Sequence, residues 1–301
     1  MISIFSGKDA WFFFTISATI IYGIINFMYK VAAEHNSSSR LIVNISAGSI
    51  SIISLIFILI FNYQFINLKW ILIFAAINSS FFALGSVAKI SALKKIPTSY
   101  AFPITKLNSI LLIIYGLFLF NESPKLTQWI GIIISVGMLI YISLSSQTGR
   151  LELPKFSKKN KELLGILLAL LAAVATSFSM LTGKYASSEV PKMNYIFVSY
   201  SMVFIYTTII GTFFKNKKKP KDTNIKKTIM FGIIIGILNF TGYLCVLNAF
   251  ETGPLTLIQG ISSNSFVIPI ILSIIVFKEK FGWKNFIVVV LSVITIIIIK
   301  L

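Results

Sequence analysis

Two stretches share one pattern and decide the fold: residues 92–123, ALKKIPTSYAFPITKLNSILLIIYGLFLFNES, and residues 247–280, LNAFETGPLTLIQGISSNSFVIPIILSIIVFKEK. Each carries a proline near its start, continues as a long apolar run and reaches a glutamate near its end. Proline suits the first turn of a helix, because its missing N–H would have no partner there. Four pairs of identical residues keep the same 157-residue spacing: Gly85 and Gly242, Ala92 and Ala249, Pro97 and Pro254, Glu122 and Glu279. The chain therefore contains an internal repeat.

The composition around these stretches indicates a membrane protein. Of 301 residues, 56% are hydrophobic and only 12% are charged. Soluble domains are about 45–50% apolar and about 25% charged. Residues 11–33 form an apolar run that is too long for the roughly 7–15-residue core of a signal peptide, so we expect them to stay as the first membrane span.

Ten segments are long and apolar enough for spans, since a helix needs about 20 residues to cross the hydrocarbon. A spanning strand would need only about 9–11 residues. We therefore predict an all-α integral membrane protein with ten transmembrane helices: 11–33, 41–61, 70–93, 98–120, 128–144, 163–184, 195–214, 228–250, 255–277 and 283–299.

A basic polar stretch divides the ten segments five and five. We expect a first repeat at 1–145, a linker at 146–162 and a second repeat at 163–301. Because five is an odd number, the second copy enters the membrane from the opposite side, and the five-helix repeats are inverted. Inverted repeats build many alternating-access transporters, with the substrate site near the midplane.

The paired stretches, with WIGIIISVGMLIY after the first and VVVLSVITIIII after the second, resemble the ten-span EamA-like members of the drug/metabolite transporter superfamily. The resemblance covers nearly the whole chain. It implies a permease; members carry amino acids, metabolites, nucleotide sugars or drugs. The family's more usual Gly-Glu pair is here Asn121-Glu122 and, in the second copy, Lys278-Glu279.

Several other chemistries have no support in the sequence. Cys245 and His35 are the only residues of their types, so no Cys or His cluster can hold a metal or act as a catalytic group. There is no Gly-Lys-Ser/Thr loop for nucleotide phosphates. We expect no cofactor and no enzymatic activity, although a membrane-embedded enzyme remains an alternative.

The net charge of +18 lies mainly in short loops beside apolar segments. Such loops orient spans and meet anionic lipid, so we expect a lipid partner and no nucleic acid. The charge bias places both termini outside the cell, whereas the family resemblance implies the reverse, so orientation stays open. We predict a multi-pass protein of a bacterial plasma (inner) membrane. Its oligomeric state, coupling ion and direction of transport are left open.

Two lysines stand out as candidate substrate-binding residues. Lys106 lies about 12 Å along its predicted span at 1.5 Å per residue, and Lys89 lies at a comparable depth. A charge at this depth is costly and usually faces a cavity or a partner. None of the nine acidic residues lies deep in a predicted span. The substrate would then supply the negative charge, as an amino-acid carboxylate or another organic anion.

Snorkelling to the membrane surface is the competing interpretation for these lysines, and it is favoured for Lys30 and Lys184, which lie nearer to span ends. By the 157-residue spacing, Ser263 matches Lys106. The remaining candidates are polar residues within predicted spans, for each of which an interhelical hydrogen bond is the competing role: Tyr22, Asn26, Asn239, Tyr243 and Asn264. Gly232 and Gly236 predict close helix packing.

From the repeat and the resemblance we expect the chain to be a secondary transporter of a small metabolite, such as an amino acid or an organic anion. Its repeats would rock around a central polar cavity, with Pro97, Pro103, Pro254 and Pro269 shaping the fourth and ninth spans. A multidrug efflux carrier, a lipid flippase or channel, and a non-transporting membrane scaffold are the alternatives.

Overall fold

The computed structural model describes residues 9–35, 37–93, 95–96, 98–145, 159–213, 225–277 and 283–301, and this part of the chain contains helices and no strand. The first half forms α1 (Ala10–Glu34), α2 (Ser39–Phe61), α3 (Leu68–Leu93), α4 (Thr98–Leu119) and α5 (Leu126–Ser145). The second half forms α6 (Lys159–Glu189), α7 (Lys192–Phe213), α8 (Ile225–Thr252), α9 (Leu255–Ser262), the 3₁₀ turn η3 (Ser263–Phe266), α10 (Val267–Phe277) and α11 (Trp283–Lys300). Every predicted span overlaps a helix or, for 255–277, the run of α9, η3 and α10; residue 214, the predicted end of the seventh span, lies outside the described residues.

Seven candidate spans in the described part are long and apolar enough to cross a membrane, and they lie in α1, α2, α3, α6, α7, α8 and the run from α9 to α10. The remaining three predicted spans contain shorter apolar helices, Ile104–Leu119, Leu126–Met138 and Phe286–Lys300. The shorter apolar helix in α4 begins at Ile104 and includes Lys106. By length and composition, the expectation of ten spans therefore holds for seven.

The outer surface is apolar, as a lipid-facing surface must be. On α2, for example, Leu59 and Ile60 are each 67% exposed. In water so many exposed large side chains would favour aggregation. In lipid these side chains contact apolar acyl chains. The helices satisfy their own backbone N–H and C=O groups, as a membrane requires.

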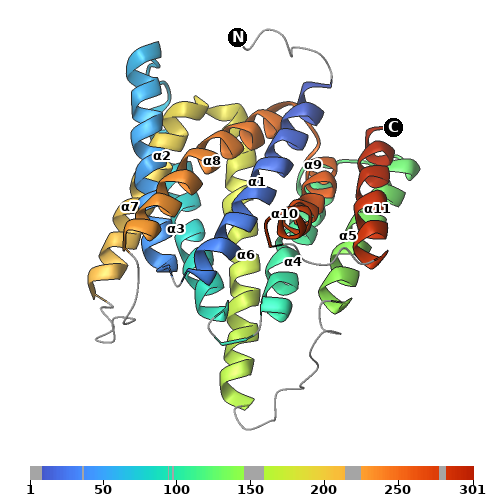
Figure 1. The fold of residues 1–301 in the computed structure, drawn as a ribbon. Helices are drawn as coiled ribbons and strands as arrows, with labels where there is room; N and C mark the ends of the chain where they lie inside the picture. The colour runs from blue at the N-terminus through green and yellow to red at the C-terminus, as the bar shows by residue number, and fades with distance from the viewer. Residues whose placement is uncertain are drawn as a thin grey trace.

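The contacts between helices follow the division into halves. α3 packs against α6, and α8 packs against α1; α2 contacts α8, and α7 contacts α3. α2 also meets α7, α4 meets α9, and α5 meets α11. If the two halves are exchanged, the first four contacts convert into one another in pairs, and the last three stay the same. The start of α1 and the end of α11 lie at the same end of the bundle (Figure 1), which we call the terminal end.

The repeated glycines occupy matching places in this pattern. A Cβ atom on Gly85 of α3 would lie 2.8 Å from Thr176 Cγ2 on α6. A Cβ atom on Gly242 of α8 would lie 3.0 Å from Ile21 Cγ2 on α1. Both glycines therefore permit the close approach of equivalent helix pairs.

The prediction for the glycine pair on α8 is confirmed. A Cβ atom on Gly232 would lie 2.8 Å from Ile45 Cβ, and one on Gly236 would lie 2.7 Å from Ser49 Cβ. The two glycines lie four residues apart and so share one helix face. That face packs directly against α2.

The end of α4 explains why an asparagine replaces the family's usual glycine. Asn121 has φ 51°, in the left-handed region, which glycine and asparagine tolerate better than most residues. The next backbone N–H, of Glu122, donates to the Gly116 carbonyl at 3.2 Å. This turn ends the helix and directs Glu122 back along it.

Candidate functional site

The second-half span 255–277 is interrupted in its middle by η3. Pro269 has no N–H, so the carbonyl of Ser265, four residues earlier, cannot receive the usual helical hydrogen bond. The preceding turn takes 3₁₀ form, in which the Val267 N–H donates to the Asn264 carbonyl. A 3₁₀ stretch inside a helix often marks a hinge.

Lys106 of the first half meets this interruption. Its Nζ donates a hydrogen bond to Ser265 Oγ at 3.2 Å. Ser265 is only 2% exposed, so the contact lies inside the bundle. Lys89 of α3 lies close enough to act electrostatically on Lys106. The fold therefore brings the two predicted lysines together and adds a serine from the other half.

The described carboxylates lie far from the middle of the helices. Asp9, Glu34, Glu122, Glu162, Glu189 and Glu251 all occupy helix ends or the residues beside them. Glu251, for example, forms an ion pair with Lys192. Within the described ranges, therefore, no acidic side chain comes from the same part of a helix as Lys106. A positive charge at Lys106 in this setting favours a negatively charged ligand.

The residue before Ser265 joins the interrupted span to α5. Asn264 Nδ2 donates to Ser135 Oγ at 3.1 Å and to the Gly260 carbonyl at 3.2 Å. Among the described residues, Asn264 Oδ1 and Asn108 Oδ1 are buried and have no hydrogen-bond partner. A buried acceptor without a partner costs about 1–3 kcal/mol, so the amide oxygen of Asn264, next to Ser265, is suited to accept a hydrogen bond from a ligand.

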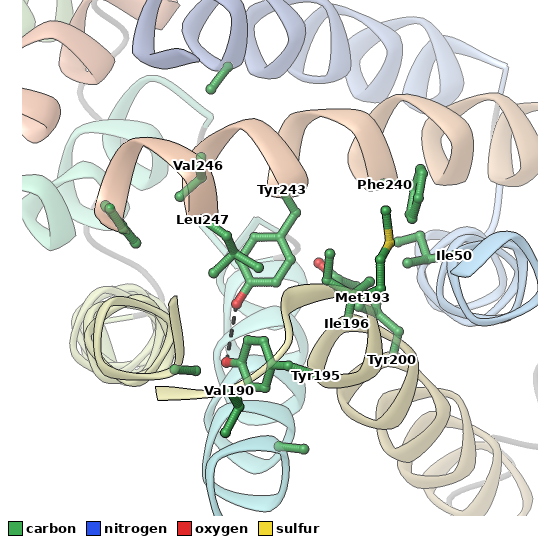
Figure 2. Close-up of a cluster of buried hydrophobic side chains, with 14 of the residues drawn as sticks. Ile50, Val190, Met193, Tyr195, Ile196, Tyr200, Phe240, Tyr243, Val246 and Leu247 are labelled. Atoms are coloured by element: carbon green, nitrogen blue, oxygen red, sulfur yellow. Dashed lines mark hydrogen bonds between the residues drawn. The ribbon is translucent and has the colours of Figure 1, made fainter. Parts of the chain in front are cut away.

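A second group of predicted residues gathers around Tyr243. The hydroxyl of Tyr243 lies 3.3 Å from that of Tyr195, and Asn78 Nδ2 donates to it at 3.4 Å. Ser179 in turn donates to Asn78 Oδ1. Figure 2 shows the two tyrosine hydroxyls pointing toward one another among apolar side chains such as Leu247. The Tyr243 hydroxyl thus already has hydrogen-bond partners within the protein.

The group extends over five helices, α1, α3, α6, α7 and α8. Tyr200 lies 5.7 Å from Tyr243 between ring centroids, edge to face, and Asn239 lies within hydrogen-bonding reach of Tyr200. Tyr22 is an electrostatic neighbour of Tyr243. We call Tyr22, Tyr195, Tyr200 and Tyr243 the tyrosine cluster. Asn26 is half-buried one helical turn along α1 from Tyr22.

The tyrosine cluster and the lysine contact meet α1 at the same level but on different sides. Tyr22 faces α8, where a Cβ atom on Gly242 would lie 3.6 Å from its Cε2. The next residue, Gly23, faces the interrupted span, where a Cβ atom would lie 2.9 Å from the Ser265 carbonyl oxygen. The predicted site residues thus fall into two groups that contact α1 at neighbouring residues.

Comparison with known families accounts for nearly the whole chain. The model of the EamA-like transporter family matches residues 9–144 and 163–301. This chain belongs to the EamA-like transporter family. The family comprises membrane permeases of the drug/metabolite transporter superfamily, so this member is a multi-pass membrane transporter rather than an enzyme.

A solved structure has the same fold as this EamA-like transporter. The crystal structure, described only as "Crystal structure of protein", matches with a TM-score of 0.77 and 14% sequence identity, over 98% of this chain and 99% of the other. At this identity the match shows the fold alone. No curated protein matches the chain.

Some residues of both groups were not among the sequence candidates. Ser265 could have been found from Pro269, which stands four residues later and removes a helical hydrogen bond. Asn78, Ser179, Tyr195 and Tyr200 come from three helices, and no spacing in the sequence links them. In the described part of this transporter, no three His, Cys, Asp or Glu residues are placed to hold a metal ion.

Proposed function

We propose that this protein is a secondary transporter that carries a small organic anion, such as an amino acid or another carboxylate metabolite, by alternating access. The hydrogen bond from Lys106 to Ser265 carries the proposal, because it joins a charged group of one half to the interrupted span of the other. A ligand that binds Lys106 there contacts both halves at once. Its binding would therefore respond to their relative position.

We further propose ten spans arranged as two inverted repeats, 1–145 and 163–301, joined by the linker 146–162. The exchange symmetry of the helix contacts and the matching places of Gly85 and Gly242 support this arrangement. Rocking one repeat against the other would change the contacts between α4 and η3. The ligand site would then open alternately to the two membrane faces.

The membrane we propose is a bacterial plasma membrane, with anionic lipid beside the basic loops. One observation favours a second candidate, a drug efflux carrier: the tyrosine cluster offers aromatic faces of the kind that attract organic cations. The two candidates differ in the sign of charge on the substrate, so the same binding experiment separates them.

The test is a thermal-unfolding screen of the detergent-purified protein with amino acids, mono- and dicarboxylates, and lipophilic cations. A ligand that binds only the folded state stabilises it, by about 2.7 kcal/mol at 100 times its Kd. We expect stabilisation by an anion, its loss in Lys106→Ala, and its partial return in Lys106→Arg, which keeps the charge.

Lys192→Ala is the matched control, because Lys192 pairs with Glu251 at a helix end and lies away from the site. It should keep the stabilisation by the anion. Stabilisation by lipophilic cations alone, or an anion effect that survives Lys106→Ala, would contradict the anion proposal. Counterflow of the bound ligand in vesicles then separates a carrier from a channel or a scaffold.

A further inference from the structure

The junction between α8 and α9 leaves helix ends inside the protein at the terminal end of the bundle. The first N–H groups of any helix have no partner within the helix and need an outside acceptor. The residue at the N-cap of α9 is Pro254, which makes no capping hydrogen bond with its side chain. The start of α9 therefore depends on another part of the chain.

Glu122, from the other half, supplies the missing acceptors. The Leu255 N–H donates to Glu122 Oε1 at 2.6 Å, and the Thr256 N–H donates to Oε2 at 2.8 Å. The Thr256 hydroxyl donates to Oε2 at 2.7 Å. Hydrogen bonds to a carboxylate are stronger than neutral ones, and a negative charge suits the start of a helix.

Lys184 binds the backbone carbonyls on the α8 side of the same junction. Its Nζ donates to the Gly253 carbonyl at 2.9 Å and to the Phe250 carbonyl near the end of α8. It also interacts electrostatically with Glu122. A cation thus neutralises the end of one helix and an anion the start of the next. The sequence favoured snorkelling for Lys184, and the structure gives its Nζ these two backbone carbonyls as partners at the end of the bundle.

Gly116 allows this arrangement by letting α4 touch α9. A Cβ atom on Gly116 would lie 2.6 Å from Thr256 Cγ2 and 2.9 Å from Glu122 Oε2. Any larger residue would push the carboxylate or the start of α9 away. All three Glu122 side-chain bonds at the junction therefore need the two halves in close contact.

We propose that Glu122 is a latch that closes the transport path at the terminal end. The inference rests on the proposed carrier function, since a latch matters only if the halves move. A cap of purely local purpose would come from the residues beside α9, as in most helices. This cap comes from the opposite half, so α9 is fully capped only while the terminal end is closed.

The experiment uses two single-cysteine reporters in a Cys245→Ala background, labelled with a water-soluble maleimide. Leu257→Cys is buried in α9, between the latch and the level of Ser265. Ile104→Cys is on α4, on the other side of Lys106, and packs near Ile96. The labelling rates report opening toward each end and need no substrate.

We expect Glu122→Gln to raise the labelling rate of the Leu257 reporter about tenfold, which corresponds to about 1.4 kcal/mol. The Ile104 reporter should slow, because a carrier that opens at one end closes at the other. Gly116→Ala should act in the same direction without removing the carboxylate, and it decides the question if Glu122→Gln does not fold. Glu251→Gln is the control: this exposed carboxylate pairs with Lys192 and should change neither rate.

Faster labelling of both reporters would indicate general loosening and overturn the proposal. So would unchanged rates in a variant that still unfolds cooperatively. Unchanged labelling rates together with normal counterflow would contradict the latch and leave the proposed carrier function in place. Opposite changes in the two labelling rates, without counterflow of any ligand, would support the latch and contradict the transport proposal.

Discussion

Helix α4 and the span from α9 to α10 are the same element of the repeat, yet they differ in their middles. α4 runs without interruption from Thr98 to Leu119, whereas the second span is interrupted by η3. Lys106 on α4 corresponds by spacing to Ser263, whose hydroxyl donates to the Gly260 carbonyl of its own helix at 2.7 Å. The two copies of the repeat therefore begin and end at matching positions. The positive charge, Lys106, occurs only in the first copy, and the interruption η3 occurs only in the second.

The positions of the prolines account for this difference. Pro103 is the sixth residue of α4, so the hydrogen bond it removes, to the Ser99 carbonyl, lies near the start of the helix. Pro269 stands in the middle of its span and removes a bond that a regular helix would have. The 3₁₀ turn follows from that position.

The largest effect is expected from Pro269→Leu, which would make the second span resemble α4. The new N–H can bond to the Ser265 carbonyl, so the unfolding free energy should rise by up to about 3 kcal/mol. At the same time Ser265 Oγ should turn away from Lys106, and the affinity for the anion should fall about tenfold. Thermal unfolding with and without the ligand measures both quantities.

Pro254→Ala is the control for this prediction, since Pro254 lies at the N-cap of α9, where no helical bond is missing. It should leave the affinity for the anion unchanged. An unchanged affinity in Pro269→Leu would show that the interruption does not shape the site.

A smaller effect is expected where the halves are alike. Gly85→Ala and Gly242→Ala should each lower the unfolding free energy by about 1–3 kcal/mol, because the new Cβ would overlap the facing helix. Gly137→Ala is the control, with no atom within 4 Å of its Cβ position. Sensitivity at only one of the two repeated glycines, measured by thermal unfolding, would contradict the exchange symmetry of the helix contacts.

The smallest effect is expected at the end of α4. Asn121→Gly relieves a left-handed residue and should raise the unfolding free energy by at most about 1 kcal/mol. Ser123→Gly, at an exposed position without positive φ, should lower stability slightly or leave it unchanged. Equal responses of the two variants in thermal unfolding would argue against strain at Asn121.

Much of the architecture could be predicted from the sequence because it depends on local quantities. Long apolar runs must be helices in lipid, since only a helix satisfies its own backbone there. The pair Gly232 and Gly236 share one helix face by spacing alone. The depth of Lys106 likewise follows from counting residues along its helix.

The sequence by itself determined the helices, the repeat, the membrane setting and the depth of two unusual lysines, because each depends on the order of residues along the chain. Only the tertiary structure decided that Lys106 meets Ser265, that Tyr22 of α1 is a neighbour of Tyr243 on α8, and that Glu122 caps α9. These partners lie on different helices. Which side chains meet there depends on how each helix is rotated about its axis and which helix it faces, and packing of the whole bundle sets both.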